Sequence, residues 1–390
     1  MKTLMFVEGG SIDGGEEPRY SGILRYWRGA FRALKEADID VYLVTTRDSS
    51  PLRDTAQDSA IEVDSLSCEG WRTYLRGASR LRAICDAVRP DVIHANEPIQ
   101  GFIAGLAFRR SSSPKIVYHR HHLAHSWKIG ILDWLATRLA DAVIVVSESV
   151  AHEVSSSSKV FVALNGICPL REVGHDEIRL LRESLGVTDE SVVFGCIGHL
   201  RREKGHRTLL AACSLARQAV GSELEVLIVG DGPERGPLEQ AASSLSRVRF
   251  VGHQVDVALW LRTVDVIVLP SQREGFGLVA VEAMAAGTPI LAAGTGGLNE
   301  VITSGVEGFH FPPEDALELA RLMVRLIDDV AIRKTLGENG VRRYRSSFMP
   351  GQMVDRWREC YAAIAKPSRF DPPPPPTGQV ASSGGDSSPG

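Results

Sequence analysis

The sequence is poor in cysteine: six cysteines are spread over 390 residues, and none forms a Cys-x-x-Cys pair or a spacing typical of metal ligands. This pattern excludes a disulfide scaffold and a cysteine-based zinc module, which both need cysteines at short, regular intervals. We expect the six thiols to be reduced and structural. The histidines between His119 and His125 do not suggest a metal site either, because adjacent histidines rarely point at one centre. We therefore expect neither a metal nor a bound cofactor.

Long hydrophobic runs are also missing. The longest uncharged stretch, Ala283–Asn299, is interrupted by glycines and a proline, which argues against a membrane span. The apolar stretch Thr3–Val7 is too short for the core of a signal peptide. Neither sign of charge dominates, since 44 Lys and Arg face 48 Asp and Glu for a net charge of −4. That balance argues against a nucleic-acid binder, and we expect a cytoplasmic protein.

The composition that is present, 44% apolar and 24% charged, is that of an ordinary globular protein. A chain of 390 residues is too long for one core, so two domains are expected. Short β-rich runs alternate with helical patterns such as Gly22–Lys35, whose apolar residues share one face. Alternation of this kind, with uniformly apolar strands, predicts parallel sheets covered by helices on both faces. The expected fold is α/β, with two doubly wound, Rossmann-like domains that face a central cleft.

The expected domain boundaries follow from this alternation of strands and helices. The first domain spans residues 1–170, the second spans 176–350, a C-terminal helix over 351–366 packs back toward the first domain, and a Pro/Gly/Ser tail over 367–390 is disordered. The predicted strands are Leu4–Val7, Val41–Thr45, Asp91–His94, Lys115–Tyr118, Ala142–Ser147 and Val160–Leu164 in the first domain, and Val192–Ile197, Leu224–Val229, Val248–Gly252, Val264–Leu269, Pro289–Ala292 and Gly308–Phe311 in the second.

The densest motif lies in the second domain, between Pro270 and Met284. A predicted strand ends at Pro270, a glycine-bearing loop follows, and a helix starts near Leu278. The free N–H groups of that first helical turn, reached past glycines, form an anion site suited to phosphates. Glu282 falls one turn inside the apolar helix and needs a partner, which ribose hydroxyls could supply. The alternative is an ordinary strand–turn–helix with a solvated carboxylate, but the second carboxylate, Glu274, favours a functional site.

Two further loops follow strands of the same domain. The segment Gly198–Gly205 carries basic side chains at the carboxyl end of a strand, which suits a diphosphate, although such runs are often merely solvated. The segment Gly230–Gly236 looks like a dinucleotide fingerprint, but its third glycine comes one residue late and it follows the second strand of its domain. We interpret it as a structural turn.

Taken together, these motifs resemble the group 1 glycosyltransferases, the retaining enzymes of glycosyltransferase family 4 with the GT-B fold. The likeness covers nearly the whole chain to about residue 365. Its most specific part is the E-x7-E element from Glu274 to Glu282. The supporting pieces, in chain order, are VIHANEP, VVSESV, LNG, the G-x-L-x-x-x-K-G segment at 198–205, VGDGPER, FVGH and GGLNEVITSGVEGF.

The resemblance implies roles for residues of the second domain. The backbone of the loop Gly275, Phe276, Gly277 and Leu278 would hold the donor phosphate, and Glu282 would hold the ribose. Glu274 would contact the hydroxyls of the donor sugar. Lys204 would bind the diphosphate and neutralise the leaving group, and the loop around Val251–His253 would lie near the base. The donor would be a UDP- or GDP-linked sugar.

In the first domain, Gly22 matches the phosphate-facing glycine turn. A histidine near the end of the fourth strand usually approaches the donor sugar, and His121 fits best, with His119 second. The sequence departs from the family at His199, which stands where the family has an arginine, and at residues 9–22, which are longer and more acidic than the usual turn. Both departures concern donor affinity and choice rather than fold.

Fewer sequence motifs indicate the acceptor site. From Trp71 to Arg138 there are 11 Lys and Arg against four Asp and Glu. The helical stretch Trp71–Arg89 is either a basic face for peripheral contact with anionic lipid at the inner face of the membrane, or a core helix with a solvated arginine face. We favour the core helix.

Three functions are compatible with these observations. The favoured one is an enzyme, a retaining hexosyltransferase that moves a sugar from a nucleotide-diphosphate donor to an acceptor hydroxyl in glycan, glycolipid or natural-product biosynthesis. The second is a GT-B sugar-nucleotide epimerase or phosphorylase. The third is a non-catalytic nucleotide-sugar-binding partner subunit, which His199 motivates. No covalent nucleophile is identifiable, so retention would proceed by substitution on the front face of the sugar.

Overall fold

The computed structural model describes residues 1–7, 21–46, 50, 52–68, 73–108, 113–123, 127–154, 159–188, 190–220 and 224–365. The acidic part of the segment 9–22, Trp71, His125 and the tail 367–390 lie outside the described residues. All six cysteines are within them, and none forms a disulfide. None of the described helices combines the length and apolarity needed to cross a bilayer.

The N-terminal half contains a seven-stranded sheet in which every strand pair is parallel, in the order β3-β2-β1-β4-β5-β6-β7. All six predicted strands are found, each within two residues at both ends. The edge strand β3 is not among the predicted strands. The strands are β1 (Lys2–Val7), β2 (Asp40–Thr45), β3 (Glu62–Ser65), β4 (Val92–Ala95), β5 (Lys115–Arg120), β6 (Ala142–Val145) and β7 (Lys159–Val162).

Helices cover both faces of this sheet, as expected from its central strands β4 and β6, which are buried along their whole length. One core places α3 and α4 against β2, β4 and β5, and the other joins α1 to the C-terminal helix α15. In the basic helix α3, Leu81 and Ile84 are buried whereas Leu75 is 73% exposed, so the apolar residues of this helix lie only partly in the core. The helices are α1 (Ser21–Glu36), α2 (Leu52–Asp58), α3 (Tyr74–Val88), α4 (Pro98–Phe108), α5 (Trp127–Leu139) and α6 (Glu148–Ala151).

The C-terminal half repeats the design with a six-stranded parallel sheet in the order β10-β9-β8-β11-β12-β13. Four of its strands match the prediction at both ends, while β11 starts two residues later and β12 is shifted by one. The strands are β8 (Val192–Ile197), β9 (Leu224–Val229), β10 (Val248–Gly252), β11 (Val266–Leu269), β12 (Ile290–Ala293) and β13 (Gly308–Phe311).

Two cores again sandwich this sheet. One packs α8, α9 and α13, and the other packs α10, α11 and α14 and continues into the N-terminal half through residues such as Tyr118 and Val145. The helices are α7 (His175–Ser184), the short 3-10 helix η2 (Arg202–Lys204), α8 (His206–Val220), α9 (Arg235–Ala241), α10 (Val257–Thr263), α11 (Leu278–Ala286), α12 (Leu298–Val301), α13 (Ala316–Asp328), α14 (Val330–Ser347) and α15 (Pro350–Ile364).

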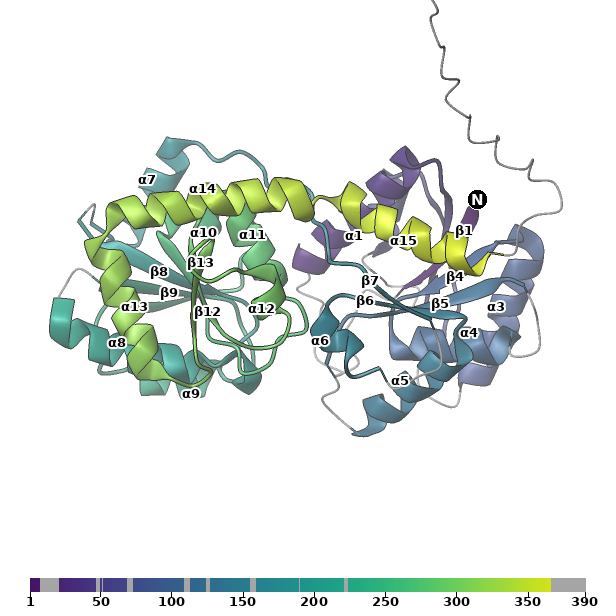
Figure 1. Cartoon of the computed structure of the whole chain (residues 1–390), viewed down its shortest axis with the longest axis horizontal. Helices are drawn as coiled ribbons and strands as arrows, with labels where there is room; N and C mark the ends of the chain where they lie inside the picture. Colours follow the sequence, from purple (N-terminus) through teal and green to yellow (C-terminus); the bar gives the residue numbers. More distant parts are fainter. Residues whose placement is uncertain are drawn as a thin grey trace, which may run out of the picture.

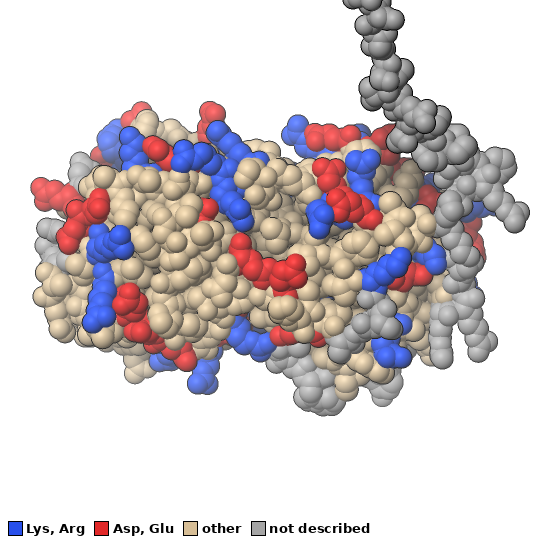
Figure 2. All heavy atoms as spheres, in the orientation of Figure 1, with Lys and Arg blue, Asp and Glu red and all other residues tan. Residues whose placement is uncertain are grey.

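The two halves lie side by side, and the chain returns to the first half at its C-terminal end (Figure 1). Helix α14 runs along the second half, and α15 continues across the first. There Trp357 and Tyr361 are fully buried, and Trp357 packs against Trp27 of α1 with ring centroids 6.4 Å apart. On the face shown in Figure 2, Lys and Arg are interspersed with Asp and Glu and form no continuous patch of one sign.

Candidate active site

The predicted site begins with an ion pair between two of its residues. Lys204 ends η2, directly after β8, and Glu274 lies in the loop after the neighbouring strand β11. Lys204 Nζ donates to Glu274 Oε2 at 2.6 Å, and Ser271 Oγ donates to the same oxygen at 3.1 Å. The carboxyl ends of parallel neighbouring strands meet at one sheet edge, which explains how residues 70 apart come together.

The glycine loop after Glu274 is shaped by its own glycines and by a second glycine pair beneath it. Gly277 caps α11 with a φ of +98°, a conformation that favours glycine. Gly296 and Gly297 pack closely against this loop. A Cβ at Gly296 would lie 2.1 Å from the Glu274 carbonyl oxygen, and a Cβ at Gly297 would lie 2.3 Å from the Gly275 carbonyl oxygen. The N–H of Gly297 also donates to the Glu274 carbonyl at 2.9 Å. The loop is thus held rigidly at the N-terminus of α11.

Within this loop, Gly275 and Leu278 are partly exposed, whereas Phe276 is buried. The Phe276 ring packs edge-on against Phe348, with centroids 6.2 Å apart. Phe276 therefore anchors the loop by its side chain and can contribute only its backbone to a ligand. The first N–H groups of α11 have no partner within the helix, so this end carries partial positive charge.

Glu282 lies one turn into α11 and is only 3% exposed. Its partner comes from the other half of the molecule: Arg25 of α1 donates through Nη1 to Glu282 Oε1. Burial raises the pKa of the Glu282 carboxyl, and the Arg25 charge and hydrogen bond act against that rise. Arg25 is not among the residues predicted from sequence, because nothing in the pattern of the first helix marks a polar residue that reaches the second domain.

The N-terminal half meets the glycine loop with its own strand ends. Ser147, just after β6, donates through Oγ to the Gly275 carbonyl at 2.7 Å. His121, just after β5, lies so near that a Cβ at Gly275 would be 3.1 Å from its carbonyl oxygen. The structure therefore brings His121 opposite the loop that the sequence motifs single out. Gly22 falls in the first turn of α1, the helix that also carries Arg25.

His121 belongs to a buried group of histidines. Its Nε2 lies 2.7 Å from Asn96 Oδ1, and its ring stacks on His119 at a centroid distance of 4.0 Å. His119 Nδ1 lies 3.0 Å from His94 Nε2, and His94 Nδ1 lies 2.6 Å from the hydroxyl of Tyr361. Burial lowers the pKa of His94 and of His121 to about 3, so both rings are neutral at pH 7. His119 is fully buried and His121 partly exposed, and the backbone of His121 is the part of this group that lies near the glycine loop.

His199 follows β8 and is exposed. Partial desolvation and the charges of Arg201 and Lys204 lower the pKa of its imidazole, so the ring is neutral at pH 7 and does not supply the charge of the family's arginine. The turn at Gly230 supports this loop, because a Cβ at Gly230 would lie 1.8 Å from the Gly198 carbonyl oxygen. Gly230 therefore has a packing role in this turn.

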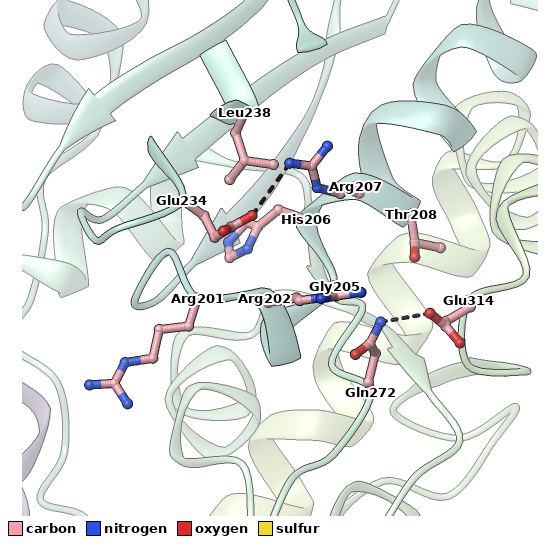
Figure 3. Close-up of a pocket in the computed structure, with 10 residues that line it drawn as sticks. All are labelled: Arg201, Arg202, Gly205, His206, Arg207, Thr208, Glu234, Leu238, Gln272 and Glu314. Carbon is pink, nitrogen blue, oxygen red and sulfur yellow. Dashed lines mark hydrogen bonds and ion pairs between the residues drawn. The ribbon is translucent and has the colours of Figure 1, made fainter. Parts of the chain in front are cut away.

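A small cavity of about 130 Å³ lies between the starts of α8 and α9 and is also lined by Gln272 and Glu314 (Figure 3). Arg207 and Glu234 pair across it at 3.5 Å, and Gln272 donates to Glu314 at 2.7 Å. None of the predicted ligand residues lines this cavity. Among the described residues, no group of His, Cys, Asp and Glu is arranged to hold a metal ion.

Known families match both halves of the chain. Residues 20–169 match the family described as Glycosyltransferase Family 4, and residues 191–329 match the one described as Glycosyl transferases group 1. An uncharacterised glycosyltransferase of Methanocaldococcus jannaschii is 31% identical over 289 residues, which cover 71% of this chain and 69% of the relative. A D-inositol 3-phosphate glycosyltransferase of Catenulispora acidiphila is 30% identical over 315 residues, which cover 72% and 74% of the two chains.

Solved structures agree on the fold. The Anabaena protein HepE, crystallised with UDP and glucose, superimposes with a TM-score of 0.77 at 24% identity, covering 93% of this chain and all of that one. The lipopolysaccharide glycosyltransferase WaaG superimposes with a TM-score of 0.67 at 14% identity, over 93% and 99% of the two chains. With two parallel α/β domains of the GT-B type, this chain belongs to the group 1 glycosyltransferases of family 4.

Proposed function

We propose that the protein is a retaining hexosyltransferase that moves a sugar from a nucleotide-diphosphate donor to an acceptor hydroxyl. One observation carries the proposal: the Lys204–Glu274 pair, the N-terminus of α11 and the buried Glu282 converge on one sheet edge, opposite His121. Lys204 and the helix N-terminus match the diphosphate of such a donor, the Glu274 carboxylate matches its sugar, and the Glu282 carboxylate matches its ribose.

The charge distribution suits departure of a diphosphate. Glycosyl transfer places negative charge on the leaving group and positive charge on the sugar ring. Lys204 and the N-terminus of α11 both stabilise the negative charge where it develops, and each such preorganised contact contributes about 2.7–4 kcal/mol to the lowering of the barrier. We propose that these two features do so without a metal or other cofactor.

Glu274 is held by Lys204 before any donor arrives. A lysine ammonium has three N–H donors, so Lys204 can keep its bond to Glu274 and still bind a phosphate oxygen. The carboxylate of Glu274, fixed in this way, can accept hydrogen bonds from sugar hydroxyls. His121 would approach the same sugar from the N-terminal half, with a neutral ring and its Nε2 bonded to Asn96.

UDP is the first nucleotide to test, because the similar HepE structures contain UDP, UDP-glucose, or UDP with glucose. The acceptor is proposed only as a hydroxyl-bearing molecule. Similar proteins are described as acting on D-inositol 3-phosphate, on 2-deoxystreptamine and in capsular polysaccharide synthesis. These descriptions span a small polyol, an aminocyclitol and a polymer, so they define an acceptor chemistry rather than one acceptor.

The test is calorimetric titration of UDP, GDP and ADP into the wild-type protein and into Glu282→Ala. We expect one nucleotide to bind in the micromolar range and the substitution to weaken it by about tenfold or more, because a charged hydrogen-bond acceptor is lost from a buried site. Glu183→Ala, which removes an exposed carboxylate on α7, is the matched control and should bind as the wild type does.

Equal binding by Glu282→Ala and the wild type would contradict the assignment of this site. If no nucleotide binds the wild-type protein, the non-catalytic alternative becomes the better account. His199→Arg, which replaces the neutral imidazole with the arginine found in the family, is then the first variant to test.

A further inference from the structure

The Arg25–Glu282 contact joins the two halves at the carboxylate that the proposed function gives to the ribose. Arg25 lies on α1 of the N-terminal half, and Glu282 lies on α11 of the C-terminal half, 257 residues away in sequence. The Arg25 side chain is 20% exposed to solvent, and the Glu282 side chain is only 4% exposed. Arg25 of the N-terminal half therefore neutralises a buried carboxylate on an apolar helix of the C-terminal half.

The contact uses only one oxygen of the carboxylate. Arg25 Nη1 donates to Oε1, and Oε2 accepts no hydrogen bond from any described residue. A carboxylate has two oxygens with about four acceptor directions in all. Glu282 thus keeps a whole oxygen for hydroxyl donors while Arg25 holds the other.

Burial makes this arrangement necessary. A buried carboxylate without a partner is strongly disfavoured in its ionised form, so it takes up a proton. The neutral acid then donates one hydrogen bond through its O–H, whereas the ionised carboxylate could accept hydrogen bonds from two hydroxyls. The surroundings on α11 are apolar: Ala280, Val281, Ala283 and Met284 are all buried. The positive charge that keeps Glu282 an acceptor must then come from another element, and α1 supplies it.

We propose that Arg25 is a positioning residue of the donor site: it orients Glu282 through Oε1 so that Oε2 accepts the 2′- and 3′-hydroxyls of the donor ribose. This inference rests on the proposed function and adds to it. It makes recognition of the ribose depend on both halves of the molecule, because the nucleotide-binding carboxylate is correctly set only when α1 lies against α11.

The test separates ribose recognition from binding of the rest of the nucleotide. UDP and 2′,3′-dideoxy-UDP are titrated calorimetrically into the wild-type protein, Arg25→Ala, Arg25→Lys and Glu282→Ala. We expect the wild type to prefer UDP by about tenfold, a ratio typical of hydrogen bonds to a charged group. Arg25→Ala should lose most of that preference by binding UDP more weakly, with binding of the dideoxy nucleotide unchanged, and Arg25→Lys should retain part of it.

Arg28→Ala is the matched control, since Arg28 lies on the same helix with a side chain that is 65% exposed. It should keep the full preference. Thermal unfolding of each variant shows whether the protein is folded, and the ratio of the two affinities does not depend on how much active protein is present.

Two results would overturn the inference. Arg25→Ala could keep the tenfold preference, which would make the ion pair irrelevant to the ribose. It could also bind both nucleotides more tightly, which would make Arg25 a competitor of the donor rather than its helper. If Glu282→Ala itself keeps the preference, the ribose assignment in the proposed function is wrong, and that failure is distinct from a failure of Arg25 alone.

Discussion

Two histidines are buried in the N-terminal core with neutral rings. His94 and His119 are both fully buried, and no described residue partners His119 Nε2. Burial lowers the pKa of His94 to about 3 and that of His119 well below its usual value. In the unfolded chain the same imidazoles take up protons near pH 6.5. Unfolding therefore binds protons whenever the pH lies between these values.

From this we predict acid sensitivity in a defined window. Because the unfolded state binds more protons, the free energy of unfolding should fall as the pH drops below 6.5, with a slope that approaches roughly 1.4 kcal/mol per pH unit for each such histidine. Urea denaturation at intervals between pH 7 and 5.5 measures this slope before the carboxylates titrate. His119→Gln should reduce it, and an unchanged slope in that variant would show that His119 is not the group responsible.

At the scale of elements, the loop at Glu274 depends on the close approach of Gly296. This residue has a φ of +48°, and a Cβ there would lie 2.1 Å from the Glu274 carbonyl oxygen. Gly296→Ala should cost about 1–2 kcal/mol of stability from the left-handed backbone alone. It should also displace the loop and weaken nucleotide binding by more than tenfold, which calorimetry would detect.

The matched control for this substitution is Gly236→Ala. Gly236 lies in helix α9 with open space around its Cβ position, so alanine there should be neutral or stabilising by up to about 1 kcal/mol. If Gly296→Ala binds nucleotide as well as this control does, the glycine pair is not what holds the loop.

Most of the elements could be predicted from sequence, and the exceptions have physical causes. Strands β8 and β9 are buried throughout and apolar apart from Glu225 of β9, so their boundaries are visible in the pattern. Strand β3, with the sequence EVDS, is short and lies at the sheet edge with only Ser65 buried, and its polar residues hid it. Arg25 could not be predicted as part of the site, because its contact depends on how the two halves meet rather than on a local pattern.

At the scale of the whole molecule, the carboxylate of Glu300 links the two halves beside the candidate site. Glu300, on α12 of the C-terminal half, accepts hydrogen bonds from the backbone N–H groups of Glu148 and Ser149 at 2.7 and 2.8 Å and from the Ser149 hydroxyl at 2.6 Å. These donors begin α6 of the N-terminal half. Together with the bond from Ser147 to Gly275, they join the N-terminal half to α12 and the glycine loop of the C-terminal half.

We predict that Glu300→Ala allows the two halves of the molecule to move further apart. The loss of hydrogen bonds to a charged acceptor is worth roughly 1.5–3 kcal/mol, enough to shift the balance toward a more open form. Small-angle X-ray scattering should show a larger radius of gyration without nucleotide and a smaller one when UDP is added. Glu338→Ala, an exposed change on α14, should leave the scattering unaltered. Identical curves for the wild type and Glu300→Ala would show that other contacts set the domain arrangement.

The return of α15 to the first half has a consequence for how the chain matures. Trp357, Cys360 and Tyr361 complete a core that begins with Trp27 and Phe31, and the whole second sheet is encoded between them. During synthesis, domains usually fold in order from the N-terminus. Here the first half must wait, with part of its apolar interior uncovered, until the second half has left the ribosome, so the domain that is made first is the last to be finished.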